Sequence, residues 1–311
     1  MNPHDIKRTA PPPAPDPRRD RHEPTPAPTP APPKPTPPPT TEPAPAGVFY
    51  QPSASFGKWA SRGINALWGF DAGSGDTLDE WCVKAKAAGL RYWLQCYRTT
   101  APGCAPPVFP LAIDPVAIAH ANDPNLIGWI LPDEPNGVGN IAATDLLTFY
   151  RACKSVAPHV DVYCNLDGGH ILQFGQAGAA PYLACCDVPC SDHYPDNYDS
   201  NDAGNLTVIA NDLRDWKPCS KSAVILECSN QGIAGQSWCA GTPLAAGMRA
   251  PTAADMQAEF WDAKAGGITA IVYFPQFIGA QNGTDGGFSY DDMNLDEIAA
   301  MAAINKAWTA A

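Results

Sequence analysis

The sequence LIGWILPDEPN, which spans Leu126–Asn136, combines an apolar run with an abrupt acidic end at Glu134. A second segment of the same kind, AVILECSN at Ala223–Asn230, ends its apolar run at Glu227. An apolar run that stops at a carboxylate is typical of a parallel strand that is buried on both faces and delivers a charged group to one edge of its sheet. Two such strands predict a pair of carboxylates, which is what cleavage of a glycosidic bond requires.

From residue 48 onward, segments with strand character alternate with segments with helix character. Capping pairs such as Thr77 with Glu80 and Thr252 with Asp255 mark helix starts, and glycines mark helix ends. Strands are predicted at Val48–Gln51, Ile64–Phe70, Leu90–Cys96, Leu126–Leu131, Val160–Asn165, Asp187–Ser191, Ala223–Leu226 and Ile268–Phe274. Helices are predicted at Ser53–Ser61, Thr77–Gly89, Asp114–Asn122, Thr144–Val156, Ala180–Cys186, Asn205–Asp215, Thr252–Gly266 and Asn294–Trp308.

Eight rounds of strand and helix predict an α/β fold, a parallel (β/α)₈ TIM barrel. A doubly wound open sheet is the structural alternative, and the lack of a GxGxxG loop after the first strand argues against it. Polar residues also follow every predicted strand, at the end of the barrel where such folds build their sites. These residues are Gln51, Asp71, Gln95, Asp133 with Glu134, Asn165 with Asp167, Asp192 with His193 and Tyr194, Glu227 with Asn230, and Gln276.

The N-terminal segment has a different composition. Residues 1–46 hold 18 of the 35 prolines, mixed with threonine and alanine. Such a segment buries too little apolar surface to offset its ordering entropy, and its prolines favour extended polyproline II. It is predicted to be a disordered linker or tail that acts as a semi-rigid spacer, with a proline-rich recognition motif as the alternative. Residues 47–311 are predicted to form a single catalytic barrel domain.

The overall charge and the apolar runs exclude several classes of partner. A net charge of −12, without a basic patch outside the tail's RRDR, argues against nucleic acid, and no run approaches the roughly 18 to 20 apolar residues of a membrane span. No cofactor is predicted, and the protein is expected to be a monomer. Eleven cysteines and the sequons at Asn205 and Asn282 favour an extracellular or surface-displayed protein. No apolar leader region is visible, so a cytoplasmic or virion-associated location stays open.

The segments GWILPDEP, at the end of the fourth predicted strand, and ILECSN, at the end of the seventh, resemble those of retaining glycoside hydrolases built on (β/α)₈ barrels. The longer stretches AHANDPNLIGWILPDEPN and GGITAIVYFPQ are similar to glycoside hydrolases with a DEP motif, and the resemblance covers roughly residues 47–311. It implies that Glu134 is the general acid/base and Glu227 the nucleophile in hydrolysis of a poly- or oligosaccharide. The acid must then hold its proton near neutral pH, while the nucleophile stays ionised.

The sequence departs from the family pattern at one position. The family's residue before the acid is asparagine, which hydrogen-bonds the sugar 2-hydroxyl, and Asp133 stands there instead. An aspartate still accepts that bond, but its charge raises the pKa of Glu134 further or favours a ligand with an amino group or a bound cation. The same substitution is also consistent with lost hydrolytic activity.

Further residues near strand ends are expected to bind the sugar. Flat aromatic faces stack on sugar C–H faces while polar neighbours bind hydroxyls, although about half of the aromatic candidates would simply pack as core because strand positions alternate. Trp129 is expected to be core, and Trp93 and Trp238 are further aromatic candidates. The predicted substrate-binding residues are Asp133, Trp68, Gln95, Asn165, Asp167, His193, Tyr194, Asn230 and Tyr273.

Two other functions are consistent with the sequence. The first is a catalytically inactive carbohydrate-binding or structural barrel displayed on the proline-rich spacer. The second is a metal-dependent barrel hydrolase that uses Asp192, His193 and Asp167, which the lack of a His-x-His pair at a strand end disfavours. The acids also have structural interpretations, a solvated acid pair in a turn for Asp133 and Glu134, and a structural ion pair for Glu227.

Overall fold

The structure, a computed structural model, describes residues 43–70, 75–98, 109–137, 140–167, 176–192, 194, 219–229, 251–276 and 289–309. The chain divides into two units, and all of these residues belong to the second, Glu42–Ala311.

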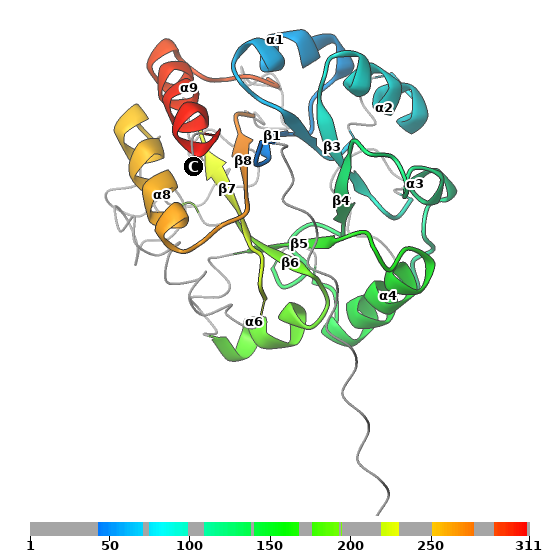
Figure 1. Ribbon diagram of the computed structural model, residues 1–311. Coiled ribbons are helices and arrows are strands. Elements are labelled where there is room, and N and C mark those ends of the chain that lie inside the picture. Colours follow the sequence, from blue (N-terminus) through cyan, green and yellow to red (C-terminus); the bar gives the residue numbers. More distant parts are fainter. Residues whose placement is uncertain are drawn as a thin grey trace, which may run out of the picture. The chain divides into compact units, whose positions relative to one another are not determined.

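Eight parallel strands form a closed barrel in sequence order, and the last strand pairs with the first. The strands are β1 (Ala46–Phe49), β2 (Ala66–Trp68), β3 (Arg91–Gln95), β4 (Leu126–Ile130), β5 (Val162–Asp167), β6 (Val188–Asp192), β7 (Ala223–Glu227) and β8 (Ala270–Phe274). The helices are η1 (Ser53–Ser55), α1 (Phe56–Ser61), α2 (Leu78–Ala87), α3 (Pro115–Ala119), α4 (Ala143–Val156), α6 (Gln176–Leu183), α8 (Ala253–Ala265) and α9 (Leu295–Thr309). Figure 1 shows these helices around the outside of the strands, which confirms the predicted TIM barrel.

The barrel begins slightly earlier than the predicted boundary at residue 47. Ala46 is fully buried within β1, and its amide donates to Asn65 Oδ1 at 2.8 Å. The carbonyl oxygen of Pro45 accepts from the Ile271 amide and from Trp308 Nε1, both at 3.1 Å. The first strand therefore lies two residues nearer the N-terminus than Val48–Gln51. A proline fits at the edge of a strand because its carbonyl still accepts although it has no N–H to donate.

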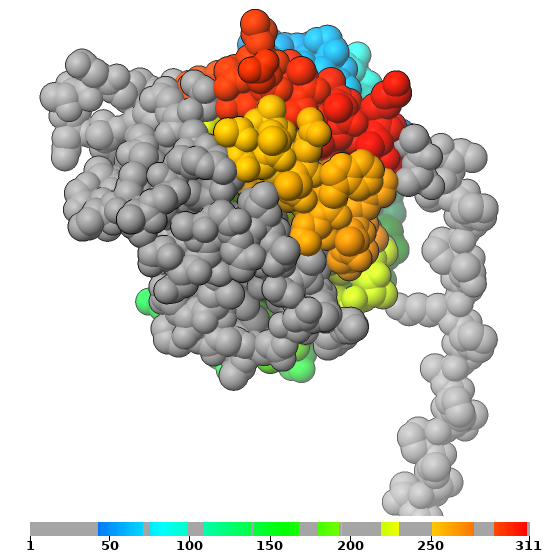
Figure 2. All heavy atoms as spheres, turned by 90° about the vertical axis from the view of Figure 1, so that its left-hand side faces the viewer, coloured from blue at the N-terminus to red at the C-terminus, as the bar shows by residue number. Residues whose placement is uncertain are grey.

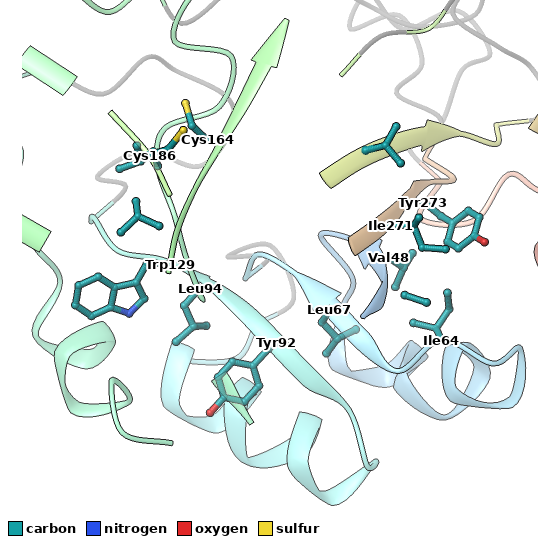
Figure 3. Packing of buried hydrophobic residues seen from close by; sticks show 14 of the residues in the cluster. Val48, Ile64, Leu67, Tyr92, Leu94, Trp129, Cys164, Cys186, Ile271 and Tyr273 are labelled. Atoms are coloured by element: carbon teal, nitrogen blue, oxygen red, sulfur yellow. The ribbon is translucent and has the colours of Figure 1, made fainter. Parts of the chain in front are cut away.

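Side chains alternate between two buried layers along every strand, as the period of two requires. The outer layer lies between strands and helices, and Figure 3 shows part of it, where Val48, Ile64 and Ile271 lie together. Trp129 is fully buried in this layer, which confirms that it is core. The inner layer fills the barrel and consists of Phe49, Ala66, Trp68, Trp93, Ile130, Tyr163, Val188, Cys190, Ala223, Ile225, Ala270, Val272 and Phe274.

Aromatic rings close the barrel interior. The Trp68 ring centroid lies 5.2 Å from that of Trp93 and 5.8 Å from that of Tyr163. Gly128 leaves room for these rings, since an added Cβ would lie 2.5 Å from Tyr163 Cε2 and 2.7 Å from the Asp161 carbonyl oxygen. The filled interior restricts any site to the ends of the strands.

Capping side chains start the helices where the sequence predicts. Thr77 and Glu80 form a reciprocal capping box at α2, and Thr252 and Asp255 form another at α8. At α9 the Glu297 carboxylate accepts from the Asn294 amide at 2.7 Å, and Asn294 Oδ1 accepts from the Glu297 amide at 3.0 Å. Helices α8 and α9 pack side by side (Figure 2).

Nine of the cysteines lie in the described part of the chain, all as free thiols and eight of them buried. Within that same part, no helix is long and apolar enough to cross a membrane.

Candidate active site

Three neighbouring strands carry polar side chains to the carboxyl end of the barrel. On β5, β6 and β7 the inner-layer residues are followed, at intervals of two, by Asn165 and Asp167, by Asp192, and by Glu227. The period of two therefore directs all four side chains to the barrel interior. Asp167 and Asp192 are direct partners in the β5–β6 register, and all four residues are buried.

The turn after β4 brings a second pair of acids to the same end. Leu131 still belongs to the outer layer, but Glu134 adopts a left-handed backbone conformation with φ of 39°. Residues other than glycine rarely adopt this conformation, and where they do it often lies at a functional site. The turn is closed by the Gly137 amide, which donates to the Glu134 carbonyl oxygen at 2.9 Å. Asp133 and Glu134 remain partly exposed.

The side-chain amide of Asn165 joins the two groups of acids. Its Nδ2 donates to Asp133 Oδ1 at 2.9 Å and to Asp192 Oδ2 at 2.6 Å. Asp192 also accepts hydrogen bonds from Glu134 and from Tyr194, so one connected network links β4, β5 and β6. The Nδ2 group of Asn165 thus donates to two acids, and the predicted contact of this residue with a sugar stays a prediction.

A second set of contacts holds the turn after β4 against β5. Asn136 Nδ2 donates to the Asp167 carbonyl oxygen at 3.1 Å, and the Asp167 amide donates to Asn136 Oδ1 at 3.0 Å. Gly137 makes this approach feasible, because an added Cβ would overlap the Asp167 carboxylate. Asn136 was not among the predicted site residues. The sequence feature that could have pointed to Asn136 is its position directly after the DEP motif.

Glu134 is surrounded by groups that favour its protonated form. Burial raises the pKa of its carboxyl well above the usual value, and the charges of Asp192, Asp133 and Asp167 raise this pKa further. The hydrogen bond that Glu134 donates to Asp192 acts in the same direction. A glutamic acid that holds its proton near neutral pH is suited to act as a general acid.

Burial and the charge of Asp192 raise the pKa of Asp133 to about 7, against the lowering effect of the hydrogen bond from Asn165. Because the folded state holds this proton more tightly than the unfolded chain, it binds more protons between pH 3.8 and about 7. Asp133 therefore lowers the free energy of unfolding as the pH rises through that range.

Tyr194, which follows β6, lies close to the acids. Burial and the charges of Asp192, Glu227 and Glu134 raise the pKa of its hydroxyl well above the usual value. All three carboxylates are thus close enough to act on this hydroxyl, which stays protonated and can donate a hydrogen bond. That Tyr194 binds substrate stays a prediction.

Aromatic rings that the sequence analysis did not select line the same end of the barrel. Phe274, the last residue of β8, stacks on Tyr194 with ring centroids 6.0 Å apart and meets Phe49 edge-on at 5.4 Å. Phe49 in turn contacts Tyr50 at 4.4 Å. Phe274 is paired in register with Glu227, so its ring lies beside the second acid.

The prediction that Tyr273 binds sugar is wrong. Its ring lies in the outer layer with Ile271 and Val48 (Figure 3), and its hydroxyl donates to Asn305 Oδ1 on α9 at 3.0 Å. The alternation along β8 turns Tyr273 outward and Phe274 inward.

Replacement of Tyr273 by phenylalanine is therefore expected to lower the free energy of unfolding by about 1–2 kcal/mol, because Asn305 loses a buried donor. The kcat and KM on any glycoside that the protein cleaves should stay unchanged. Urea unfolding and steady-state kinetics measure the two quantities. The matched variant Phe274→Leu should raise KM, and an increase in KM for Tyr273→Phe instead would contradict the assignment.

Two other predicted sugar-binding residues make contacts within the barrel. Trp68 faces the interior but has no exposed surface, since Phe49, Trp93 and Tyr163 enclose its ring. Gln95 Oε1 accepts from the Phe70 backbone amide at 2.8 Å, and Gln95 Nε2 donates to the Phe70 carbonyl oxygen at 3.3 Å. Trp68 thus packs as core and is closed to a sugar, whereas Gln95 is half-buried and its predicted contact with a sugar stays a prediction.

Polar strand ends also have structural roles at β1 and β8. Gln51 Nε2 donates to the carbonyl oxygens of Phe49 and Tyr290, and Gln276 Nε2 donates to those of Phe49 and Tyr50. The inference that every polar strand end contributes to a site is therefore too broad.

His193 and Asn230, also predicted to bind substrate, lie outside the described residues. Among the residues that the structure does describe, no group of three or more histidine, cysteine, aspartate or glutamate side chains is arranged to hold a metal ion. The metal-dependent alternative that uses Asp192 and Asp167 therefore gains no support from this part of the chain.

No protein-family profile matches the sequence, and no curated protein is similar to it at the level of sequence. Solved structures do share its fold. A β-galactosidase from the psychrophilic Marinomonas ef1 superposes with a TM-score of 0.58 at 11% identity, over 84% of this chain and 59% of that protein. The β-galactosidase from Halorubrum lacusprofundi gives a TM-score of 0.54 at 14% identity, over 85% and 58%.

The endo-β-1,4-mannanase from Thermotoga petrophila gives a TM-score of 0.53 at 14% identity, over 86% of this chain and 77% of that enzyme. The chain thus spans less than two thirds of both β-galactosidases. These structural neighbours are glycoside hydrolases, and at such identities their similarity establishes a shared (β/α)₈ barrel fold.

Proposed function

We propose that this protein is a retaining glycoside hydrolase that acts on a poly- or oligosaccharide, with Glu134 as the general acid/base and Glu227 as the nucleophile. The observation that carries the proposal is the set of groups that surround Glu134. Burial and three neighbouring carboxylates favour its protonated form, at the carboxyl end of the barrel. Cleavage of a glycosidic bond requires a protonated acid that gives its proton to the glycosidic oxygen.

The second acid suits the role of nucleophile. Glu227 ends β7, three strands further round the barrel, and its side chain lies on the interior side with only 2% of its surface exposed. Tyr194 has a protonated hydroxyl within electrostatic reach of both glutamates, and Phe274 offers an aromatic ring beside Glu227. The names of the structural neighbours, β-galactosidases and a mannanase, support glycosidic bonds as the target.

In the proposed reaction the Glu227 carboxylate attacks the anomeric carbon while Glu134 gives its proton to the leaving oxygen. The bond between the anomeric carbon and that oxygen breaks, and a glycosyl ester to Glu227 forms. Water then attacks the same carbon as Glu134 takes back a proton, which releases Glu227 and retains the anomeric configuration.

The proposal is tested by a screen of aryl glycosides and polysaccharides, with proton NMR of the first sugar released. The expected result is hydrolysis with retention, together with loss of hydrolysis in the Glu134→Gln, Glu227→Gln double variant. Release of the inverted anomer would exclude Glu227 as a nucleophile. A double variant as active as the wild type would exclude both assignments.

One observation favours a second candidate, a carbohydrate-binding barrel without catalysis. Asp133 stands where the family pattern has the asparagine that hydrogen-bonds the sugar 2-hydroxyl, and its Oδ1 accepts from Asn165 Nδ2. In this case a glycan array would show binding, and every glycan that binds would remain uncleaved.

A further inference from the structure

Asp192, at the carboxyl end of β6, is where three hydrogen bonds of the site converge. Asn165 Nδ2 donates to its Oδ2 at 2.6 Å, and the Tyr194 hydroxyl and the Glu134 carboxyl also donate to it. A buried carboxylate that accepts several hydrogen bonds is stabilised in its charged form. Asp192 is only 8% exposed, so water solvates its carboxylate little.

The surroundings of the Glu134–Asp192 pair favour Glu134 as the protonated member. Burial raises the pKa of both groups, but the hydrogen bonds from Tyr194, Asn165 and Glu134 oppose this effect at Asp192. At Glu134 the charges of Asp192, Asp133 and Asp167 add to the effect of burial. Since a carboxylate has no proton to donate, a hydrogen bond between the pair requires one protonated member, and the charges that act on Glu134 favour it as the donor.

We propose that Asp192 is a positioning residue for Glu134: its carboxylate, fixed by Asn165 and Tyr194, accepts the Glu134 proton in a hydrogen bond and holds this carboxyl oriented and protonated until substrate binds. This inference rests on the proposed role of Glu134 as the acid/base. It assigns a function to Asp192, a residue that has no role in the mechanism proposed for Glu134 and Glu227.

The charge of Asp192 would serve both halves of the reaction. Before the first step it keeps the proton on Glu134, so the acid is ready at neutral pH. After Glu134 has given that proton to the leaving oxygen, two carboxylates face each other in a partly desolvated site. Their repulsion favours return of a proton to Glu134, which is the step that activates water for hydrolysis of the glycosyl ester.

The variant Asp192→Asn keeps the shape of the side chain and removes its charge. Because a like charge raises a carboxyl pKa, its loss should lower the pKa of Glu134 and move the high-pH limb of kcat/KM down by about 1–3 pH units. The control Asp161→Asn removes an acid that pairs with Lys221 at the other end of β5 and β7, and should leave the limb unmoved. A limb that stays in place in Asp192→Asn would overturn the proposal.

A second measurement does not depend on activity. Carbon-13 NMR of the Glu134 carboxyl, assigned by its loss in Glu134→Gln, should show wild-type titration in two steps shared with Asp192. In Asp192→Asn a single step at lower pH is expected. Independent single-step titration of Glu134 in the wild type would refute the coupling.

The two measurements separate the proposals. A protein that cleaves no glycoside but shows the shared titration loses the proposed function and keeps the Glu134–Asp192 pair. An active glycosidase with independent titration loses the pair and keeps the function.

Discussion

Replacement of Glu227 by alanine is expected to lower kcat by roughly 10⁴-fold or more on every glycoside that the protein cleaves. The carboxylate of a retaining nucleophile forms the bond to the anomeric carbon, so even a substrate with an excellent leaving group depends on it. The loss should thus be independent of the leaving group. Steady-state kinetics on a series of aryl glycosides measures this independence.

Azide should restore part of the activity of Glu227→Ala. Alanine leaves space beside the anomeric carbon, and the small anion can attack from the side where Glu227 stood. A carbon–nitrogen bond then forms as the bond to the leaving oxygen breaks, and the product is a glycosyl azide of inverted configuration. The matched control Leu226→Met, an outer-layer change on the same strand, should cost less than about 1.5 kcal/mol in stability and leave kcat unchanged. Full activity of Glu227→Ala without azide would remove Glu227 from the mechanism.

The barrel could be predicted because its signals are local. The segments at Leu126 and Ala223 are apolar runs, and the structure ends those strands at Ile130 and Glu227, each within a residue of the predicted end. The first strand was misplaced because its start depends on distant partners. The Pro45 carbonyl is bound by Ile271 and Trp308, and nothing within a proline-rich segment reveals those bonds.

The positions of the acids were predictable, but the direction of the aromatic side chains was not. A strand of a parallel barrel is buried on both faces, so the sequence of β8, AIVYF, is apolar throughout and has no alternation to read. A choice between Tyr273 and Phe274 then depends on a single residue of register. The aromatic face of Tyr273 made it a candidate for stacking on a sugar, whereas in the structure its ring is buried in the outer layer and its hydroxyl donates to Asn305.

The partners of the acids could not be read from the sequence either. Asp192 ends its strand as Glu227 does, but its importance comes from Asn165, Tyr194 and Glu134, which three different segments supply. Hydrogen bonds between strand ends depend on the register and shear of the closed barrel. The sequence can place these residues at one end of the barrel, but their hydrogen-bond partners are determined only in the folded chain.

Replacement of Glu134 by alanine is expected to slow the reaction by about 10²–10⁴-fold on substrates with poor leaving groups. An alkoxide or a sugar hydroxyl must be protonated as it departs, and Glu134 supplies that proton. A dinitrophenolate leaves without protonation, so its glycosides should form the glycosyl ester at nearly the wild-type rate. The ester should then accumulate, because the variant also lacks the base that activates water, and azide should speed its breakdown.

The pH dependence adds an independent test of the same residue. The raised pKa of Glu134 means that wild-type activity is lost on the alkaline side, as the acid gives up its proton. Glu134→Ala should lose this limb for dinitrophenyl substrates, whereas Glu80→Gln, a surface change in the capping box of α2, should keep it. A uniform loss across all leaving groups would assign Glu134 to the structure of the turn, and its left-handed backbone would then reflect folding and not catalysis.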